Sequence, residues 1–152
     1  MCRHMNMKPG GQMLENKLIP ADDKIQKQLN LEPGAYVVYI SRLRTADGEP
    51  VTIERNYFPV KYSFLLAKKF DDNSLFECLQ EEAKVRVITS EKQIELCRAT
   101  AAEAKLMKVK KGAPLLYIKS VAYTYDREPL YAGAQVFNGE VCSLYVCESV
   151  EQ

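Results

Sequence analysis

The chain has 152 residues, of which 47% are hydrophobic and 27% charged, and its 21 basic and 20 acidic side chains leave a net charge of +1. This length suits one domain with a single core, and the composition is that of a globular protein rather than a disordered or fibrous one. The charge balance excludes a small basic nucleic-acid-binding domain as the whole function. No apolar run approaches the roughly 20 residues of a membrane-spanning helix, so we expect no membrane partner.

The cysteines and the single histidine argue against disulfide, zinc and histidine chemistry. Five widely spaced cysteines do not form the disulfide framework of a secreted protein, so we expect reduced thiols and a cytoplasmic location. His4 lies in a segment, residues 1–11, that we expect to be a linker remnant or a disordered tail. We therefore expect no metal, no cofactor and no histidine-based catalysis.

Turn signals, capping residues and alternating apolar residues predict short strands and helices in chain order. Asp22 and Asp23 open the first helix, and Thr100 and Glu103 form a capping box at the start of the last one. In the first half of the chain, the pattern predicts an edge strand over residues 12–19, a helix over 22–32, and a hairpin of two strands over 35–45 and 51–58. In the second half of the chain, the pattern predicts a helix over residues 74–82, a strand over 85–96 and a helix over 100–111. Three hairpin-connected strands are expected after it, over residues 115–125, 130–137 and 142–146. Asn138-Gly139 is the strongest hairpin signal. Successive hairpins separated by short helices predict an α+β domain with a mainly antiparallel sheet.

Two arginines lie close together on one strand. Arg42 and Arg44 flank Leu43, so alternation places both guanidinium groups on one face, with Cα atoms about 6.6 Å apart. A three-residue loop after this strand would pair Ile40 with Glu54 and put Glu54 on the same face, diagonal to Arg42. Such a face suits a small anionic or polyhydroxylated ligand, because arginine offers a planar fork of donors. The alternative is a solvent-exposed face with cross-strand ion pairs, each contributing about 0.2–1 kcal/mol.

Two further segments offer candidate ligand contacts. Ser74 is placed to cap a helix, and the start of that helix also suits a phosphate or carboxylate. Phe76 follows and would enter the core or cover a ligand. A later strand presents a face that would either wall a ligand or pack in the core. Its residues are Tyr131, Gly133, Gln135 and Phe137. Because no phosphate loop, nucleophile elbow or catalytic carboxylate pair occurs, no catalytic residue is predicted.

One segment resembles a known family. Residues 41–54, SRLRTADGEPVTIE, resemble the UTRA domain, the effector-sensing half of GntR-type transcription regulators of the HutC group. Weaker matches follow in the same order along the chain, at residues 57–59, 73–76, 99–114 and 127–129. The similarity covers nearly the whole chain and implies a sensing domain over residues 12–148.

The resemblance implies a chorismate-lyase-like fold around a small-molecule pocket, a homodimer and no catalysis. In the family, an N-terminal winged helix-turn-helix binds operator DNA, and we expect that module to be absent from this chain. The implied partner is then a small anionic metabolite such as a sugar phosphate, whose binding modulates DNA binding by the parent dimer. Two alternatives stay open: a chorismate-lyase-like enzyme that grips carboxylates, and a dimerisation module with a vestigial pocket.

The resemblance also implies roles for individual residues. Arg42 and Arg44 would hold the phosphate or carboxylate of the effector, and Glu54 would contact its hydroxyl or amino groups. Ser74 would be a further anion contact at the helix start.

Three aromatic residues depart from the usual pattern of the family. Phe76 and Phe137 stand where tyrosine is common, and Tyr131 stands where glutamate is common. These residues are still expected to contact the effector. The pocket wall that they imply is less polar than in many members.

Overall fold

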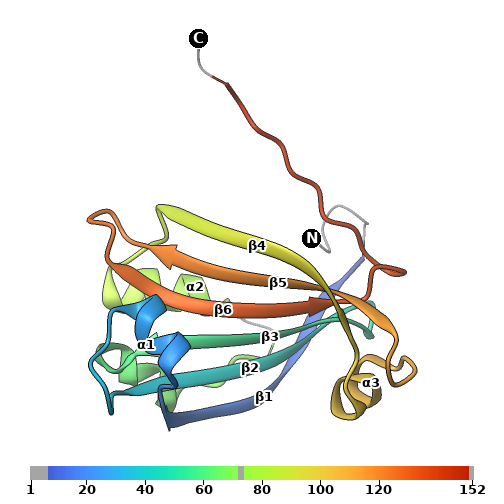
Figure 1. Cartoon of the computed structure of the whole chain (residues 1–152), viewed down its shortest axis with the longest axis horizontal. Helices are drawn as coiled ribbons and strands as arrows, with labels where there is room; N and C mark the ends of the chain where they lie inside the picture. Colours follow the sequence, from blue (N-terminus) through green and yellow to red (C-terminus); the bar gives the residue numbers. More distant parts are fainter. Residues whose placement is uncertain (1–6, 72–73, 151–152) are drawn as a thin grey trace.

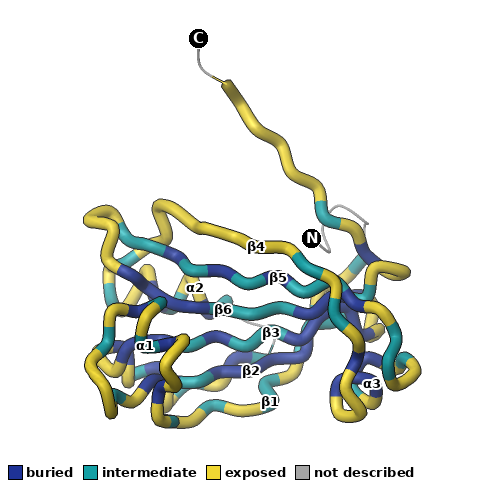
Figure 2. Tube along the Cα trace, viewed as in Figure 1, coloured by how far each residue is buried: buried dark blue, intermediate teal, exposed yellow. Residues whose placement is uncertain are grey.

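The computed structural model describes residues 7–71 and 74–150, which form one six-stranded sheet with short helices. Every neighbouring pair of strands is antiparallel, and the strand order is β1-β2-β3-β6-β5-β4 (Figure 1). The strands are β1 (Pro9–Pro20), β2 (Tyr36–Ala46), β3 (Glu49–Pro59), β4 (Thr89–Arg98), β5 (Pro114–Tyr123) and β6 (Pro129–Phe137). The edge strands β1 and β4 are more exposed than the central ones (Figure 2). The predicted α+β class is confirmed.

Short helices cover both faces of the sheet. One face carries α1 (Asp23–Leu29) and α3 (Ala101–Met107), and the other carries the 3₁₀ segment η2 (Val60–Ala67), α2 (Leu75–Cys78) and the π-helical turn η3 (Leu79–Ala83). We call these the α1 face and the α2 face. In Figure 1, α1 lies in front of the sheet and α2 behind it.

Each face has its own apolar core, because strand side chains alternate between the two sides. On the α1 face, Ile25 and Leu29 of α1 pack against Val37 of β2. On the α2 face, Leu65 of η2 and Leu75 of α2 are fully buried, in one cluster with residues of β2, β3, β5 and β6. Each such leucine contributes about 1.5–3 kcal/mol by burial, which holds the short helices against the sheet.

Capping residues fix where the helices start. The Asp22 carboxylate accepts a hydrogen bond from the Ile25 amide at 2.8 Å, as expected for the N-cap of α1. Thr100 and Glu103 form the predicted capping box at α3. A good N-cap is typically worth about 1 kcal/mol, so local sequence alone determines these helix starts.

The β2–β3 hairpin has a tighter turn than predicted. Asp47 and Gly48 both have positive φ values, 50° and 79°, and form a two-residue turn in place of the expected three-residue loop. A register shift follows between positions 44 and 45, so Arg42 pairs with Glu54, and Ile40 does not. The predicted register was wrong by two residues. Because the register differs by an even number of residues, Glu54 still lies on the predicted face of the sheet. It lies directly opposite Arg42 instead of diagonal to it.

The first strand begins earlier than the sequence indicated. Pro9–Gly11, expected within the linker segment, pair with the end of β2, while residues 1–6 of that segment lie outside the described residues. Gly11 is needed there, because a Cβ would approach the Asp71 carbonyl oxygen to 2.8 Å and the Leu43 carbonyl oxygen to 3.0 Å. This close approach brings the segment before α2 against the arginine-bearing end of β2.

The strand predicted over residues 142–146 is wrong. β6 pairs with β3 on one side and with β5 on the other, so it has no free side for a further hairpin partner. After a turn in which the Asn138 carbonyl accepts bonds from the Val141 and Cys142 amides, the chain leaves the sheet as an extended segment (Figure 1). The hairpin signal was local, whereas the pairing of β6 is decided by distant strands.

Candidate functional site

A buried ion pair joins β2 and β3 on the α2 face. Arg42 is only 3% exposed, and its Nη2 donates to Glu54 Oε2 at 2.8 Å. Gln135 of β6 donates from Nε2 to Glu54 Oε1 at 3.4 Å. Burial lowers the pKa of Arg42 from its ordinary value; Glu54 opposes this shift and Arg44 adds to it. The sheet thus sets Arg42, Glu54 and Gln135 in one polar row, which we call the Arg42 row.

Arg44 and Thr52 form the neighbouring row. They pair across the hairpin, and Arg44 Nη1 and Thr52 Oγ1 are buried without a hydrogen-bond partner among the described residues. Thr52 is 5% exposed. Buried polar atoms are usually hydrogen-bonded, so these two atoms indicate a place for a polar ligand. The sequence analysis did not identify Thr52 as a site residue, although Thr52 lies two residues before Glu54 on β3 and therefore faces the same side of the sheet.

The segment before α2 lies beside this row. Asp71 Oδ1 accepts from the Met13 amide at 2.9 Å, and Gly11 lies between the Asp71 backbone and the Arg44 side chain. Ser74 caps α2, its hydroxyl accepting from the Glu77 amide at 3.2 Å. The hydroxyl is therefore already used as a cap, with its O–H still able to donate. Asn73, part of the segment that resembles the family, lies outside the described residues.

Three aromatic rings lead from the sheet to the surface. Tyr131 of β6 lies between Phe58, at 5.6 Å between ring centroids, and Phe76 of α2, at 5.4 Å. Burial, and then the nearby Glu54 carboxylate, raise the pKa of Tyr131. Phe76 is 41% exposed. These contacts connect the Arg42 row with the surface at α2.

Phe137 has different surroundings from the other candidates. It is 1% exposed and packs in an apolar cluster with Ala46, Val51 and Ile118. It does lie on the α2 face, opposite Thr52. Its ring fills the core near the hairpin turn rather than facing an open pocket.

A cleft of about 540 Å³ opens between α2, η3 and the sheet. It is lined by Phe76, Glu77, Leu79, Gln80, Val85, Arg86, Val87, Ser90, Lys92, Leu130 and Tyr131. Of the predicted site residues, only Phe76 and Tyr131 belong to this lining. The sequence reasoning missed Lys92, because it placed no site residue on the strand that became β4.

Comparison with known proteins identifies the family. Residues 4–142 match the profile of the UTRA domain. The chain belongs to the UTRA domain family. Among its relatives, the transcriptional repressor NagR of Bacillus subtilis is 23% identical over 134 residues, 88% of this chain and 55% of that protein. MngR of Escherichia coli, repressor of a mannosyl-D-glycerate transport/metabolism system, is 26% identical over 122 residues, 80% of this chain and 51% of that protein.

Solved structures show the same fold. PhnF of Mycobacterium smegmatis superposes with a TM-score of 0.90 at 19% identity, over 99% of this chain and 67% of that one. The ligand-binding domain of a GntR-family regulator from Bordetella bronchiseptica gives 0.82 at 22% identity, over 95% and 90% of the two chains. This UTRA domain spans about half the length of the curated relatives it matches, and it is homologous to the effector-binding domains of GntR-type regulators. The predicted family is confirmed.

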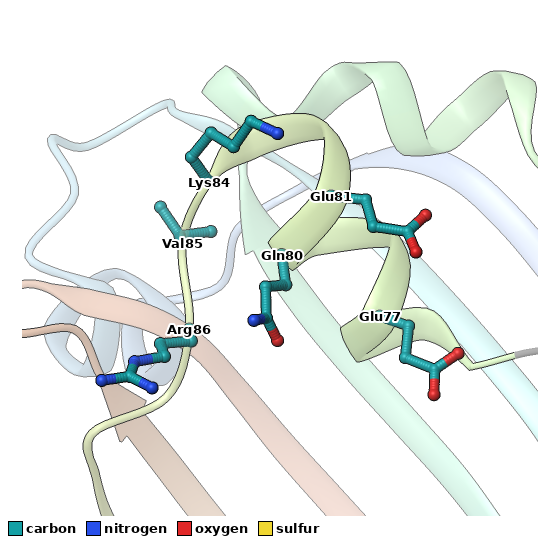
Figure 3. Close-up of a pocket in the computed structure, with 6 residues that line it drawn as sticks. All are labelled: Glu77, Gln80, Glu81, Lys84, Val85 and Arg86. Atoms are coloured by element: carbon teal, nitrogen blue, oxygen red, sulfur yellow. The ribbon is translucent and has the colours of Figure 1, made fainter.

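A second concavity of this UTRA domain is an open polar groove of about 720 Å³ at α2, η3 and the segment after them, and it shares Glu77, Gln80, Val85 and Arg86 with the cleft. Figure 3 shows its lining, with Glu77 and Glu81 projecting to one side and Arg86 to the other. No predicted site residue lines it. Among the residues that the structure describes, no three His, Cys, Asp or Glu side chains gather as a metal site, and no helix is long and apolar enough to cross a membrane.

Proposed function

We propose that this UTRA domain binds a small anionic effector on its α2 face and does so as the sensing part of a GntR-type transcription regulator. The observation that supports this most is the Arg44–Thr52 row, where a cationic donor and a hydroxyl are buried without hydrogen-bond partners in the described part of the chain. A carboxylate or phosphate beside Arg44 would accept its Nη1–H bonds in a charge-assisted contact.

The Arg42 row supports the polar part of the effector. Arg42 is already neutralised by Glu54, so this pair acts as a rigid polar surface rather than as a free cation. Among the described residues, Glu54 Oε1 accepts only one long bond, from Gln135, so it can also accept from a ligand hydroxyl or amino group. Ser74 would add a contact from α2, and Phe76 and Tyr131 would pack against the ligand body. Phe137 would act only through the core behind Thr52.

Sugar-derived anions are the first effector class to examine. Two relatives are named as repressors of a fructoselysine utilization operon and of a mannosyl-D-glycerate transport/metabolism system. A sugar phosphate combines the anion that Arg44 needs with hydroxyls for Glu54. Binding would change the operator affinity of the parent regulator, which would be a cytoplasmic homodimer carrying a winged helix-turn-helix. A tenfold change in that affinity corresponds to a coupling free energy of about 1.4 kcal/mol.

Catalysis is not part of this proposal. The relatives are transcription regulators, and no catalytic residue set was predicted. Incubation of the protein with chorismate should therefore release no pyruvate. Turnover that depends on Arg42 or Glu54 would replace the sensor function by a lyase function.

Arg44→Met is the direct test of the anion contact. Isothermal titration with a panel of sugar phosphates should show at least one ligand whose affinity falls about tenfold or more in this variant, because a charge-assisted contact is lost. Arg98→Met is the control, since Arg98 is an exposed arginine at the far end of β4 whose Nη1 donates to the Gly112 carbonyl. Equal affinities of Arg44→Met and the wild type for every ligand bound would refute the proposed site.

Ser74→Ala separates the two roles of that hydroxyl. Loss of the cap should lower the free energy of unfolding by about 1 kcal/mol. If Ser74 also contacts the anion, the variant should bind the same sugar phosphate more weakly. An unchanged affinity would restrict Ser74 to helix capping.

A further inference from the structure

Two lysines on neighbouring strands differ in their partners. Lys119 of β5 lies on the α1 face, where its Nζ donates to Glu95 Oε1 at 3.3 Å and lies 5.5 Å from the centroid of the Tyr117 ring. Lys92 of β4 lies on the α2 face and donates to the Ser120 hydroxyl at 3.0 Å. No carboxylate of the described residues forms an ion pair with Lys92.

The missing carboxylate matters because Lys92, although an exposed residue of the edge strand, lines the cleft and directs its ammonium to the buried Ser120. Burial lowers the pKa of Lys92 from its ordinary value, and no acidic group offsets this shift. Two other cations removed from water have acidic partners: Arg42 pairs with Glu54, and the partly buried Arg55 pairs with Glu103. A cation that lines a cleft and has no acidic partner among the described residues is placed to contact an anionic ligand.

Lys92 is also held in a defined position. It pairs with Ser120 across the β4–β5 ladder, and Ser120 pairs in turn with Gly133 of β6. Ser120 is 6% exposed, so the hydroxyl that accepts the hydrogen bond from Lys92 is fixed in the sheet. The ammonium is thereby directed along the α2 face, over β5, instead of extending freely from the edge strand.

The cleft around Lys92 selects for more than charge. Lys92 shares the lining of the 540 Å³ cleft with the Phe76–Tyr131 pair and with apolar residues of η3, β6 and the segment before β4. Those apolar residues are Leu79, Val85, Val87 and Leu130. Ligand pockets of this size combine apolar walls with a few placed polar groups that fix orientation. A ligand that fills this cleft therefore needs a flat or apolar part beside its polar groups.

We propose that Lys92 is a second anion-binding residue of the effector site and that the effector carries, next to its anionic group, a flat or apolar part that packs on Phe76 and Tyr131. This inference rests on the proposed function, since the cleft would then hold part of the same effector. It narrows the effector class from anionic metabolites in general to amphipathic carboxylates or phosphates.

Phenyl phosphate and inorganic phosphate are the probes. By titration calorimetry or ligand-observed NMR, the wild type should bind phenyl phosphate more tightly than inorganic phosphate, and Lys92→Met should weaken phenyl phosphate binding about tenfold. Lys119→Met is the matched control and should bind like the wild type. Absence of phenyl phosphate binding, or equal binding by wild type and Lys92→Met, overturns the inference.

Thermal unfolding without ligand gives an independent readout. Lys92→Met should leave the melting temperature close to that of the wild type, because Lys92 is exposed and forms no ion pair with the described residues. Lys119→Met should not raise it, because it breaks an ion pair. A lower melting temperature for Lys92→Met would mean that Lys92 supports the fold through Ser120 and would also overturn the inference.

The two proposals can fail separately. If Arg44→Met loses sugar phosphate binding while Lys92→Met retains both phosphate probes, the effector site stands and the role of Lys92 does not. If Lys92→Met loses phenyl phosphate binding while Arg44→Met binds every ligand like the wild type, the cleft binds anions and the proposed Arg44 contact is refuted.

Discussion

The two faces of the sheet handle buried polarity in different ways. On the α1 face, Arg55 pairs with Glu103 at 3.1 Å, and the Glu103 side chain also completes the cap of α3. On the α2 face, Asn16 Oδ1, Arg44 Nη1 and Thr52 Oγ1 are buried without hydrogen-bond partners among the described residues. A face whose polar groups satisfy one another supports the fold. A face with unsatisfied groups has retained them at a cost in stability, which is typical of binding sites.

The largest expected effect concerns the two buried ion pairs. Glu54→Gln removes the carboxylate that pairs with Arg42, so we expect a loss of about 3 kcal/mol in the free energy of unfolding, measured by urea denaturation. Glu103→Gln should cost less, about 1 kcal/mol, because Arg55 is 29% exposed along its side chain and water can replace the partner. Equal losses for the two variants would show that the faces do not differ in how strongly they bury charge.

Thr52→Val tests the opposite prediction, that part of the α2 face is destabilising. Valine has the shape of threonine without the hydroxyl, whose oxygen is buried without a partner among the described residues, so we expect a gain of about 1 kcal/mol in stability. The same variant should bind the effector more weakly.

Thr100→Val is the control from the other face. Its hydroxyl accepts from the Glu103 amide at 3.1 Å, so its loss should destabilise the protein by about 1 kcal/mol. If Thr52→Val were also destabilising, the Thr52 hydroxyl would have a structural partner and the argument for a ligand beside Arg44 would weaken.

Sequence alone predicted what depends on neighbours along the chain. The Asp22 cap, the Thr100–Glu103 capping box and the shared face of Arg42 and Arg44 follow from local spacing, and all three are present. The pairing of Arg42 was missed, because the two-residue turn and the shift after Arg44 change the register without changing the face.

What depends on distant strands could not be predicted. The Asn138-Gly139 signal could not show that β6 has β3 and β5 on its two sides. Parity placed Phe137 on the face of Tyr131, but only the packed structure shows that one ring lies in the core and the other beside the cleft. Lys92 has no motif around it. Its significance comes from the missing carboxylate, which is a property of the folded protein.

The smallest expected effect is a difference in alkaline stability between two tyrosines, one on each face. Burial raises the pKa of both Tyr131 and Tyr57, and Tyr131 is the more deeply buried of the two; Glu54 adds to the shift at Tyr131, whereas at Tyr57 Tyr39 adds to it and Arg55 opposes it. A folded-state pKa above the unfolded value means that stability is fully present below about pH 10 and is lost as the pH rises further, by at most about 1.4 kcal/mol per pH unit for one group.

Tyr131→Phe should therefore flatten the loss of stability above pH 10 more than Tyr57→Phe does, in urea denaturation repeated between pH 8 and about pH 11. Below pH 10 the difference between each variant and the wild type should not change with pH, because neither tyrosine titrates there. If Tyr57→Phe flattened the curve more, the neighbours of Tyr57 would outweigh the deeper burial of Tyr131 and the field of Glu54 together. The link between the Arg42 row and the aromatic wall of the cleft would then be one of packing alone.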